Sequence, residues 1–185
     1  RALLEGVAKE FGAIDILHNN VGASLALGDA VAVDMTEEAF DRSFAVNLKS
    51  HWMACKHAIP VMREQGHGSI VNISSMSGVR GVGYSVPYAV SKAGVIHLTT
   101  VAASQYTSQG VRINCIAPGG VDTPQMRGST ASAEAFSGRN DGHPMGRVGT
   151  ADEIANIVLW LASDEASYVS GSTYIIDGGA WASAT

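Results

Sequence analysis

Apolar residues follow two patterns along the chain. Short continuous apolar runs bounded by glycine and polar residues are typical of buried strands. Longer stretches, with apolar residues three or four positions apart, predict helices that bury one face. Strands separated by long helices indicate right-handed crossovers, a parallel sheet and helices on both of its faces. We therefore predict an α/β fold with a doubly wound parallel sheet in three layers, with strands at residues 13–17, 69–75, 111–117 and 174–176.

The predicted helices cover residues 1–11, 36–62, 87–108 and 151–162. Thr36 is the expected N-cap of the second, and Thr150 with Glu153 forms a capping box for the last. Asn47 lies beside the apolar stripe of the second helix, which consists of Phe40, Phe44, Leu48, Trp52, Cys55, Ile59 and Met62. The polar, glycine-dotted segment 122–149 lacks a period, and we expect a mobile loop with some helix there.

Three predicted strands end in polar or glycine-rich turns, at residues 19–22, 74–75 and 118–120. The carboxyl ends of parallel strands meet at one edge of a sheet, and ligands of such sheets bind there. The sequence therefore predicts a ligand site that these three turns form together.

Composition narrows the class of protein. A chain of 185 residues with 46% apolar and 16% charged residues can bury roughly 70% of its unfolded surface, so residues 1–185 are read as a single domain. The net charge is −5, whereas proteins that bind nucleic acids need an excess of basic residues to contact the phosphates. Cys55 and Cys115 stand in apolar runs, which favours reduced thiols, and no apolar run reaches the ~18 residues of a membrane span. We expect a cytoplasmic protein without nucleic-acid or membrane partners.

Tyr88 and Lys92 are the sharpest candidates for chemistry. Four residues apart on a helix, they share one face, and an ammonium beside a phenol lowers the phenol pKa from its ordinary ~10. Such a phenol can exchange a proton with an alcohol or carbonyl oxygen. The alternative is an ordinary surface pair.

Other candidates also have a plainer interpretation. Ser75, at a predicted strand end, can hold the same substrate oxygen or merely cap a turn. Asn47 can take part in the site, or face solvent or bond the helix backbone. The 6 histidines include no H-E-x-x-H motif, so we expect no metal. Met126, Phe136 and Met145 either line a substrate pocket or pack the loop.

Taken in order, the motifs resemble the short-chain dehydrogenase/reductase family, of the compact type, over nearly all of the chain. They are Asn19-Asn20-Val21-Gly22, with valine for the family's usual alanine, the mid-helix Asn47, Ile73-Ser74-Ser75, Tyr88-x-x-x-Lys92, Pro118-Gly119-Gly120-Val121-Asp122-Thr123 and Ile176-Asp177-Gly178-Gly179.

This resemblance implies a Rossmann fold and an NAD(P)-dependent oxidoreductase that interconverts a secondary alcohol and a ketone. It implies a catalytic tetrad in which Tyr88 exchanges the proton, Ser75 orients the substrate oxygen, Lys92 lowers the Tyr88 pKa and bonds the nicotinamide ribose, and Asn47 holds a relay water. The cofactor, NAD or NADP, would meet Asn20, Gly22, Tyr88, Lys92, Pro118, Gly119, the Val121 backbone and Thr123. It also implies a homo-oligomer, a dimer or tetramer, paired through the helix with Phe44, Leu48 and Trp52 and the helix after Tyr88.

The family's Thr-Gly-x-x-x-Gly-x-Gly phosphate loop has no counterpart here. The nearest string, residues 78–83, has the wrong glycine spacing. We therefore interpret the chain as the C-terminal catalytic part of the fold, lacking the first strands. Alone, it should be inactive, bind nucleotide no better than millimolar and aggregate through the edge strand 13–17. The alternatives are a non-enzymatic remnant that dimerises or binds, and an epimerase or dehydratase, whose extra substrate domain has no room here.

Overall fold

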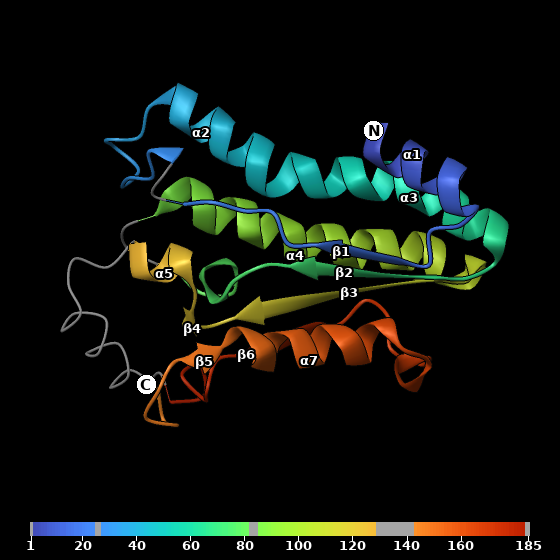
Figure 1. The fold of residues 1–185 in the computed structure, drawn as a ribbon. Helices are drawn as coiled ribbons and strands as arrows, with labels where there is room; N and C mark the ends of the chain where they lie inside the picture. Colours follow the sequence, from blue (N-terminus) through green and yellow to red (C-terminus); the bar gives the residue numbers. More distant parts are fainter. Residues whose placement is uncertain (1, 25–26, 82–84, 129–142, 184–185) are drawn as a thin grey trace.

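A four-stranded parallel sheet forms the centre of the molecule, in the order β1, β2, β3, β6 (Figure 1). This computed structural model describes residues 2–24, 27–81, 85–128 and 143–183. Asn19 lies opposite Asn72, and Ile73 lies opposite Ile116, so the carboxyl ends of β1, β2 and β3 are level. The predicted parallel sheet is confirmed, with the strands β1 (Ile16–Asn19), β2 (Gly68–Ile73), β3 (Val111–Pro118) and β6 (Thr173–Ile176).

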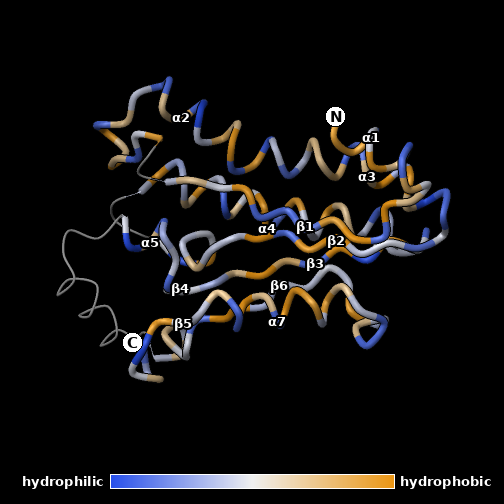
Figure 2. Tube along the Cα trace, viewed as in Figure 1, coloured by the Kyte–Doolittle hydropathy of each residue, from blue (hydrophilic) through white to orange (hydrophobic). Residues whose placement is uncertain are grey.

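Helices cover both faces of the sheet (Figure 1). On one face lie α1 (Ala2–Phe11), α3 (Ser50–Gln65) and α4 (Val86–Tyr106), and on the other lies α7 (Ala151–Ala162). Figure 2 shows long apolar stretches in β2, β3 and α7. The sheet separates two apolar clusters, and this arrangement confirms the three-layer α/β fold. The first cluster includes Met62, Ile70 and Ile113, and the second includes Val71, Ile116 and Leu161.

The long helix predicted from Thr36 consists of three parts. Thr36 is its N-cap and accepts from the Ala39 amide at 3.2 Å. The α-helical part α2 (Glu37–Phe44) leads into the π-helical turn η2 (Ala45–Lys49), which continues into α3. The apolar stripe divides as well: Cys55, Ile59 and Met62 are buried, whereas Trp52 is 43% exposed.

Most element boundaries lie within three residues of the prediction, and two differences affect the site: β1 and segment 122–149. Strand β1 begins at Ile16 because the backbone of Ile14 bonds the Gln65 side-chain amide, with its N–H donating at 2.8 Å and its C=O accepting at 3.2 Å. Within segment 122–149 the structure has α5 (Pro124–Gly128) and a short parallel ladder between β4 (Val121–Asp122) and β5 (Gly149–Thr150). Residues 129–142 of that segment lie outside the described residues.

The capping box of α7 is confirmed, since Thr150 Oγ1 accepts from the Glu153 amide at 3.2 Å and Glu153 Oε2 accepts from the Thr150 amide at 2.8 Å. Three short 3₁₀ turns complete the described elements: η3 (Met76–Gly78), η4 (Thr107–Gln109) and η6 (Asp164–Ala166). In the described part of the chain, no helix has the length and apolar character needed to cross a membrane.

Candidate active site

The turns after β1, β2 and β3 come together at one edge of the sheet, as the sequence predicts. Parallel pairing with level ends puts residues 20–22, 74–75 and 118–120 on the same side. The start of α4 lies over this edge (Figure 1). The candidate site is therefore bounded by three strand ends and one helix.

Lys92 lies beneath this edge and is only 3% exposed. Its Nζ donates to the carbonyl oxygen of Ile73, at the end of β2, at 2.9 Å. Burial lowers the pKa of Lys92 from 10.5 to about 8, because a charged ammonium is disfavoured where water is excluded. At neutral pH the side chain is still a cation.

Tyr88 precedes Lys92 by one helical turn, and Lys92 Nζ lies 5.8 Å from the centre of the Tyr88 ring. The structure thus brings together the two residues that the sequence singled out. The Lys92 ammonium thus lies over the Tyr88 ring, one turn along the same helix.

Ser75 caps the short turn η3, its Oγ accepting from the Ser77 amide at 3.1 Å. This is the plainer role that the sequence allowed, and it leaves the hydroxyl hydrogen able to donate to another acceptor. The neighbouring Ser74 donates to the Lys92 carbonyl oxygen at 2.7 Å. A side chain at Gly78 would come within 2.6 Å of the Lys92 carbonyl carbon. The close approach at Gly78 and the Ser74 bond hold the end of β2 against the backbone of α4 at Lys92.

Asn47 lies in the π-helical turn and is fully buried, which excludes the solvent-facing alternative. Its side-chain amide forms two hydrogen bonds with the backbone of Ala23: Oδ1 accepts from the Ala23 N–H at 2.8 Å, and Nδ2 donates to the Ala23 oxygen at 2.9 Å. A Cβ on the adjacent Gly22 would lie 2.9 Å from Lys92 Nζ and 3.3 Å from Asn47 Oδ1. Asn47 and Lys92 are therefore neighbours across Gly22.

The turn after β3 is fixed by its backbone. The Gly119 N–H donates to the Ile176 oxygen at 2.8 Å, and a Cβ on Gly119 would lie 2.6 Å from that of Asp177, so this position accepts only glycine without a shift. Val121 is half-buried in β4. The hydroxyl of Thr123 accepts from the Met126 amide at 3.2 Å at the start of α5.

Sequence reasoning missed a buried polar chain behind the site. Asn19 Nδ2 donates to Asn72 Oδ1 at 2.9 Å, and Asn72 Nδ2 donates to Thr99 Oγ1 at 3.0 Å. It also missed His51, which is 1% exposed and whose pKa is lowered from 6.5 to about 4, by burial first and then by the charge of Lys92. The available signal was Asn72, a polar residue inside the apolar run that predicts the second strand.

The apolar loop residues give a mixed result. Met126 Cε would be 3.1 Å from a Cβ on Gly120, so Met126 packs on the turn after β3. Met145 is 69% exposed, and Phe136 lies outside the described residues.

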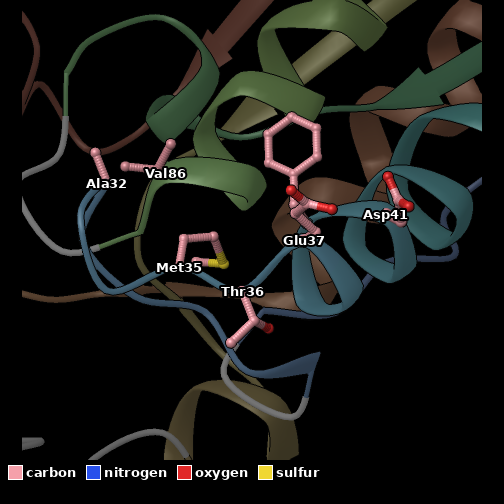
Figure 3. Close-up of a pocket in the computed structure, with 7 residues that line it drawn as sticks. Ala32, Met35, Thr36, Glu37, Asp41 and Val86 are labelled. Carbon is pink, nitrogen blue, oxygen red and sulfur yellow. The ribbon is translucent and has the colours of Figure 1, made fainter.

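A hollow of about 360 Å³ opens between the start of α2 and the start of α4, and Figure 3 shows Met35, Thr36 and Val86 around it. None of Asn47, Ser75, Tyr88 or Lys92 lines this hollow.

Comparison with known proteins relates this geometry to a family. The family described as Enoyl-(Acyl carrier protein) reductase matches residues 1–180. The 3-oxoacyl-[acyl-carrier-protein] reductase FabG of Thermotoga maritima is 39% identical over 97% of this chain and 71% of its own length. The 2-keto-3-deoxy-L-fuconate dehydrogenase of Xanthomonas campestris is 40% identical over 96% of this chain and 60% of its own length.

Solved structures agree with this assignment. The crystal structure of levodione reductase has a TM-score of 0.93 at 36% identity, covering 98% of this chain and 72% of that one. ElxO, determined with NADP bound, has a TM-score of 0.90 at 31% identity, covering 97% of this chain and 72% of that one. The chain therefore belongs to the short-chain dehydrogenase/reductase family of NAD(P)-dependent oxidoreductases.

Proposed function

We propose that the protein interconverts a secondary alcohol and a ketone, with Asn47, Ser75, Tyr88 and Lys92 as its catalytic residues. The observation that carries this proposal is the buried ammonium of Lys92, 5.8 Å from the Tyr88 ring at the edge where three strands end. A buried cation costs stability, and a protein retains such a group where it does chemical work.

Tyr88 is the group proposed to move the proton. In ketone reduction its phenol donates a proton to the carbonyl oxygen, and in alcohol oxidation its phenolate accepts the hydroxyl proton. Lys92 stabilises the phenolate by its charge. Ser75, held at the end of β2, donates a hydrogen bond to the same substrate oxygen and fixes its direction.

Asn47 is proposed to hold a water that passes protons to Lys92. Its burial and its neighbourhood to Lys92 across Gly22 support this role. The two bonds to Ala23 fix its amide group, so that the turn after β1 keeps its place beside Lys92.

The residues present fit a nicotinamide cofactor, NAD or NADP. Gly22 lets the turn after β1 approach Lys92 Nζ so closely that a Cβ there would lie 2.9 Å from it, and Gly119 lets the turn after β3 approach Asp177 closely. We propose that Asn20, Gly22, Tyr88, Lys92, Pro118, Gly119, the Val121 backbone and Thr123 hold the cofactor. When bound, the nicotinamide supplies or accepts the hydride.

The relatives' names suggest the substrate class. They include a 3-oxoacyl reductase, levodione reductase and a cis-4-hydroxycyclohexanecarboxylate dehydrogenase, which share a carbonyl or secondary alcohol carbon. We propose a small ketone or secondary alcohol of this kind for the present protein.

The test is an assay of the natively expressed protein with NAD(H) and NADP(H). The probes are levodione, cis-4-hydroxycyclohexanecarboxylate and a 3-oxoacyl thioester, followed by nicotinamide absorbance. Turnover of one probe with one nucleotide, lost in Tyr88→Phe, is the expected result. Nucleotide binding without turnover of any carbonyl or alcohol probe would favour the non-enzymatic binding module instead.

A further inference from the structure

Asp29, in the loop between β1 and α2, bonds the first turn of the helix that carries Tyr88. Its Oδ1 accepts from the Tyr88 backbone N–H at 3.3 Å. Its Oδ2 accepts from the hydroxyls of Ser24, at 2.6 Å, and of Ser85. One carboxylate thus joins two segments that are more than fifty residues apart in sequence.

The first amide groups of α4 explain why this contact matters. Ser85 is the N-cap residue, yet its side chain makes no cap bond within the helix and donates to Asp29 instead. The Val86 N–H donates to the Ala30 oxygen at 3.2 Å, Pro87 has no N–H, and the Tyr88 N–H donates to Asp29. The first bond within the helix runs from the Ala89 N–H to the Ser85 oxygen. The loop at residues 29–30 therefore accepts from every α4 amide N–H that comes before Ala89.

An N-cap side chain ordinarily accepts from the second or third amide of its own helix. Here Asp29 takes that function from a distant loop, and its negative charge also suits the positive end of the α4 dipole. Gly28, with a φ of +84°, turns the chain immediately before Asp29, where an L side chain would be strained.

The same loop is fixed at its other end by Asn47, which bonds both backbone groups of Ala23. The loop is therefore attached to the π-helical turn through Ala23 and to α4 through Asp29. Figure 3 shows Ala32 and Val86 beside each other on the hollow that this loop forms with α4. Movement at Asp29 would be transmitted directly to the first turn of α4.

We propose that Asp29 is a positioning residue for Tyr88. By capping α4 from outside, it holds the first turn of the helix, and with it the Tyr88 phenol, in place over Lys92 and Ser75. This inference rests on the proposed role of Tyr88. It concerns a residue outside the tetrad and the proposed cofactor contacts.

The experiment compares Asp29→Ala with Asp29→Asn in the natively expressed protein. The asparagine oxygen can still accept from the Tyr88 N–H, and its amide can donate to a serine hydroxyl, so Asn rebuilds the cap that Ala removes. We expect kcat per cofactor-binding site to fall about tenfold or more in Asp29→Ala and to stay within about threefold in Asp29→Asn. Hydrogen exchange at the Tyr88 amide should accelerate in Asp29→Ala by about tenfold.

Asp34→Ala is the matched control, because Asp34 is an exposed acid in the same loop. It should leave both readouts unchanged. Unchanged kcat and exchange in Asp29→Ala, or a loss that Asp29→Asn does not recover, would overturn the proposal. If Asp29→Ala does not fold, Ser85→Ala replaces it: slower turnover with faster exchange at Tyr88 supports the proposal, and wild-type values overturn it.

Failure of the proposed function gives a different result. Near wild-type turnover in Tyr88→Phe would refute the proposed role of Tyr88. Hydrogen exchange at the amide of residue 88 would still report whether Asp29 caps α4. If the Tyr88 amide then exchanges slowly in the wild type and faster in Asp29→Ala, Asp29 does cap α4. The contact between Asp29 and α4 would in that case affect the stability of the helix and not turnover.

Discussion

The Lys92 ammonium donates to the Ile73 carbonyl oxygen across 2.9 Å, joining α4 to the last residue of β2 beneath the candidate site. This bond compensates only part of the burial cost, as the lowered pKa of Lys92, about 8, indicates. The site therefore contains a charge that the fold would be more stable without.

Replacing Lys92 by methionine should stabilise the protein while abolishing turnover. The folded-state pKa, about 8, lies below the ordinary 10.5, so the unfolded chain binds more protons between these values and the free energy of unfolding rises with pH there. In Lys92→Met we expect the free energy of unfolding to increase by roughly 1–2 kcal/mol at pH 7, because the cost of burying the charge exceeds the value of the lost hydrogen bond. The free energy of unfolding should also depend less on pH. Denaturant unfolding from pH 7 to 10 measures both. Lower stability in the variant would contradict this account.

Tyr88→Phe should lower kcat by at least about 10²-fold, since only the ionisable oxygen is removed. Cofactor affinity, measured by titration calorimetry, should remain nearly intact. Tyr106→Phe is the matched control: this tyrosine lies at the far end of the same helix, under the Arg63 guanidinium. Near wild-type kcat in Tyr88→Phe would refute the tetrad.

His51 should make the fold sensitive to acid. Its pKa is about 4 in the folded protein, against 6.5 for an unperturbed histidine. As the pH falls, His51 therefore takes up its proton at a higher pH in the unfolded chain than in the folded protein. The free energy of unfolding should fall as the pH is lowered from about 6.5 to 4, and His51→Gln should weaken this dependence. His67→Gln serves as the comparison because His67 is exposed. Equal acid slopes for wild type and His51→Gln would disprove the assignment.

The helices α2 to α4 carry exposed apolar residues that predict association between copies of the chain. A shallow groove of about 570 Å³ includes Phe44, Leu48 and Trp52, and Val90 on α4 is 49% exposed. We expect a dimer or tetramer at micromolar concentration. Trp52→Glu should shift sedimentation toward the monomer, and Tyr168→Glu, at an exposed position elsewhere, should not. A monomeric wild type would contradict the prediction.

Much of the fold was readable from the sequence because each signal was local. The spacing of apolar residues predicted the parallel sheet, Thr36 predicted a helix start, and Thr150 with Glu153 predicted another. Tyr88 and Lys92 were recognisable because one helical turn joins them. Such features depend on residues at most four positions apart.

The remaining features depend on contacts between distant segments. Strand β1 starts late because Gln65, some fifty residues away, bonds the backbone of Ile14. Nothing near Asp29 in the sequence indicates its bond to the Tyr88 amide. Asn47 looked like a mid-helix asparagine until the fold placed Ala23 against it.

The π-helical turn around Asn47 makes the effect of a change in length depend on whether a residue is removed or added. In that turn the Ser50 N–H donates to the Ala45 oxygen, five residues back, while the Ser50 hydroxyl donates to the Val46 oxygen. One residue more than an α-helical turn needs is thus accommodated, and each residue turns a helix by about 100°. Deleting a single residue between 45 and 49 should therefore close the turn into a regular α-helix and leave Cys55, Ile59 and Met62 facing the sheet, at the cost of the Asn47 bonds to Ala23. Inserting a further residue there should instead rotate these three side chains by about 100° away from the sheet.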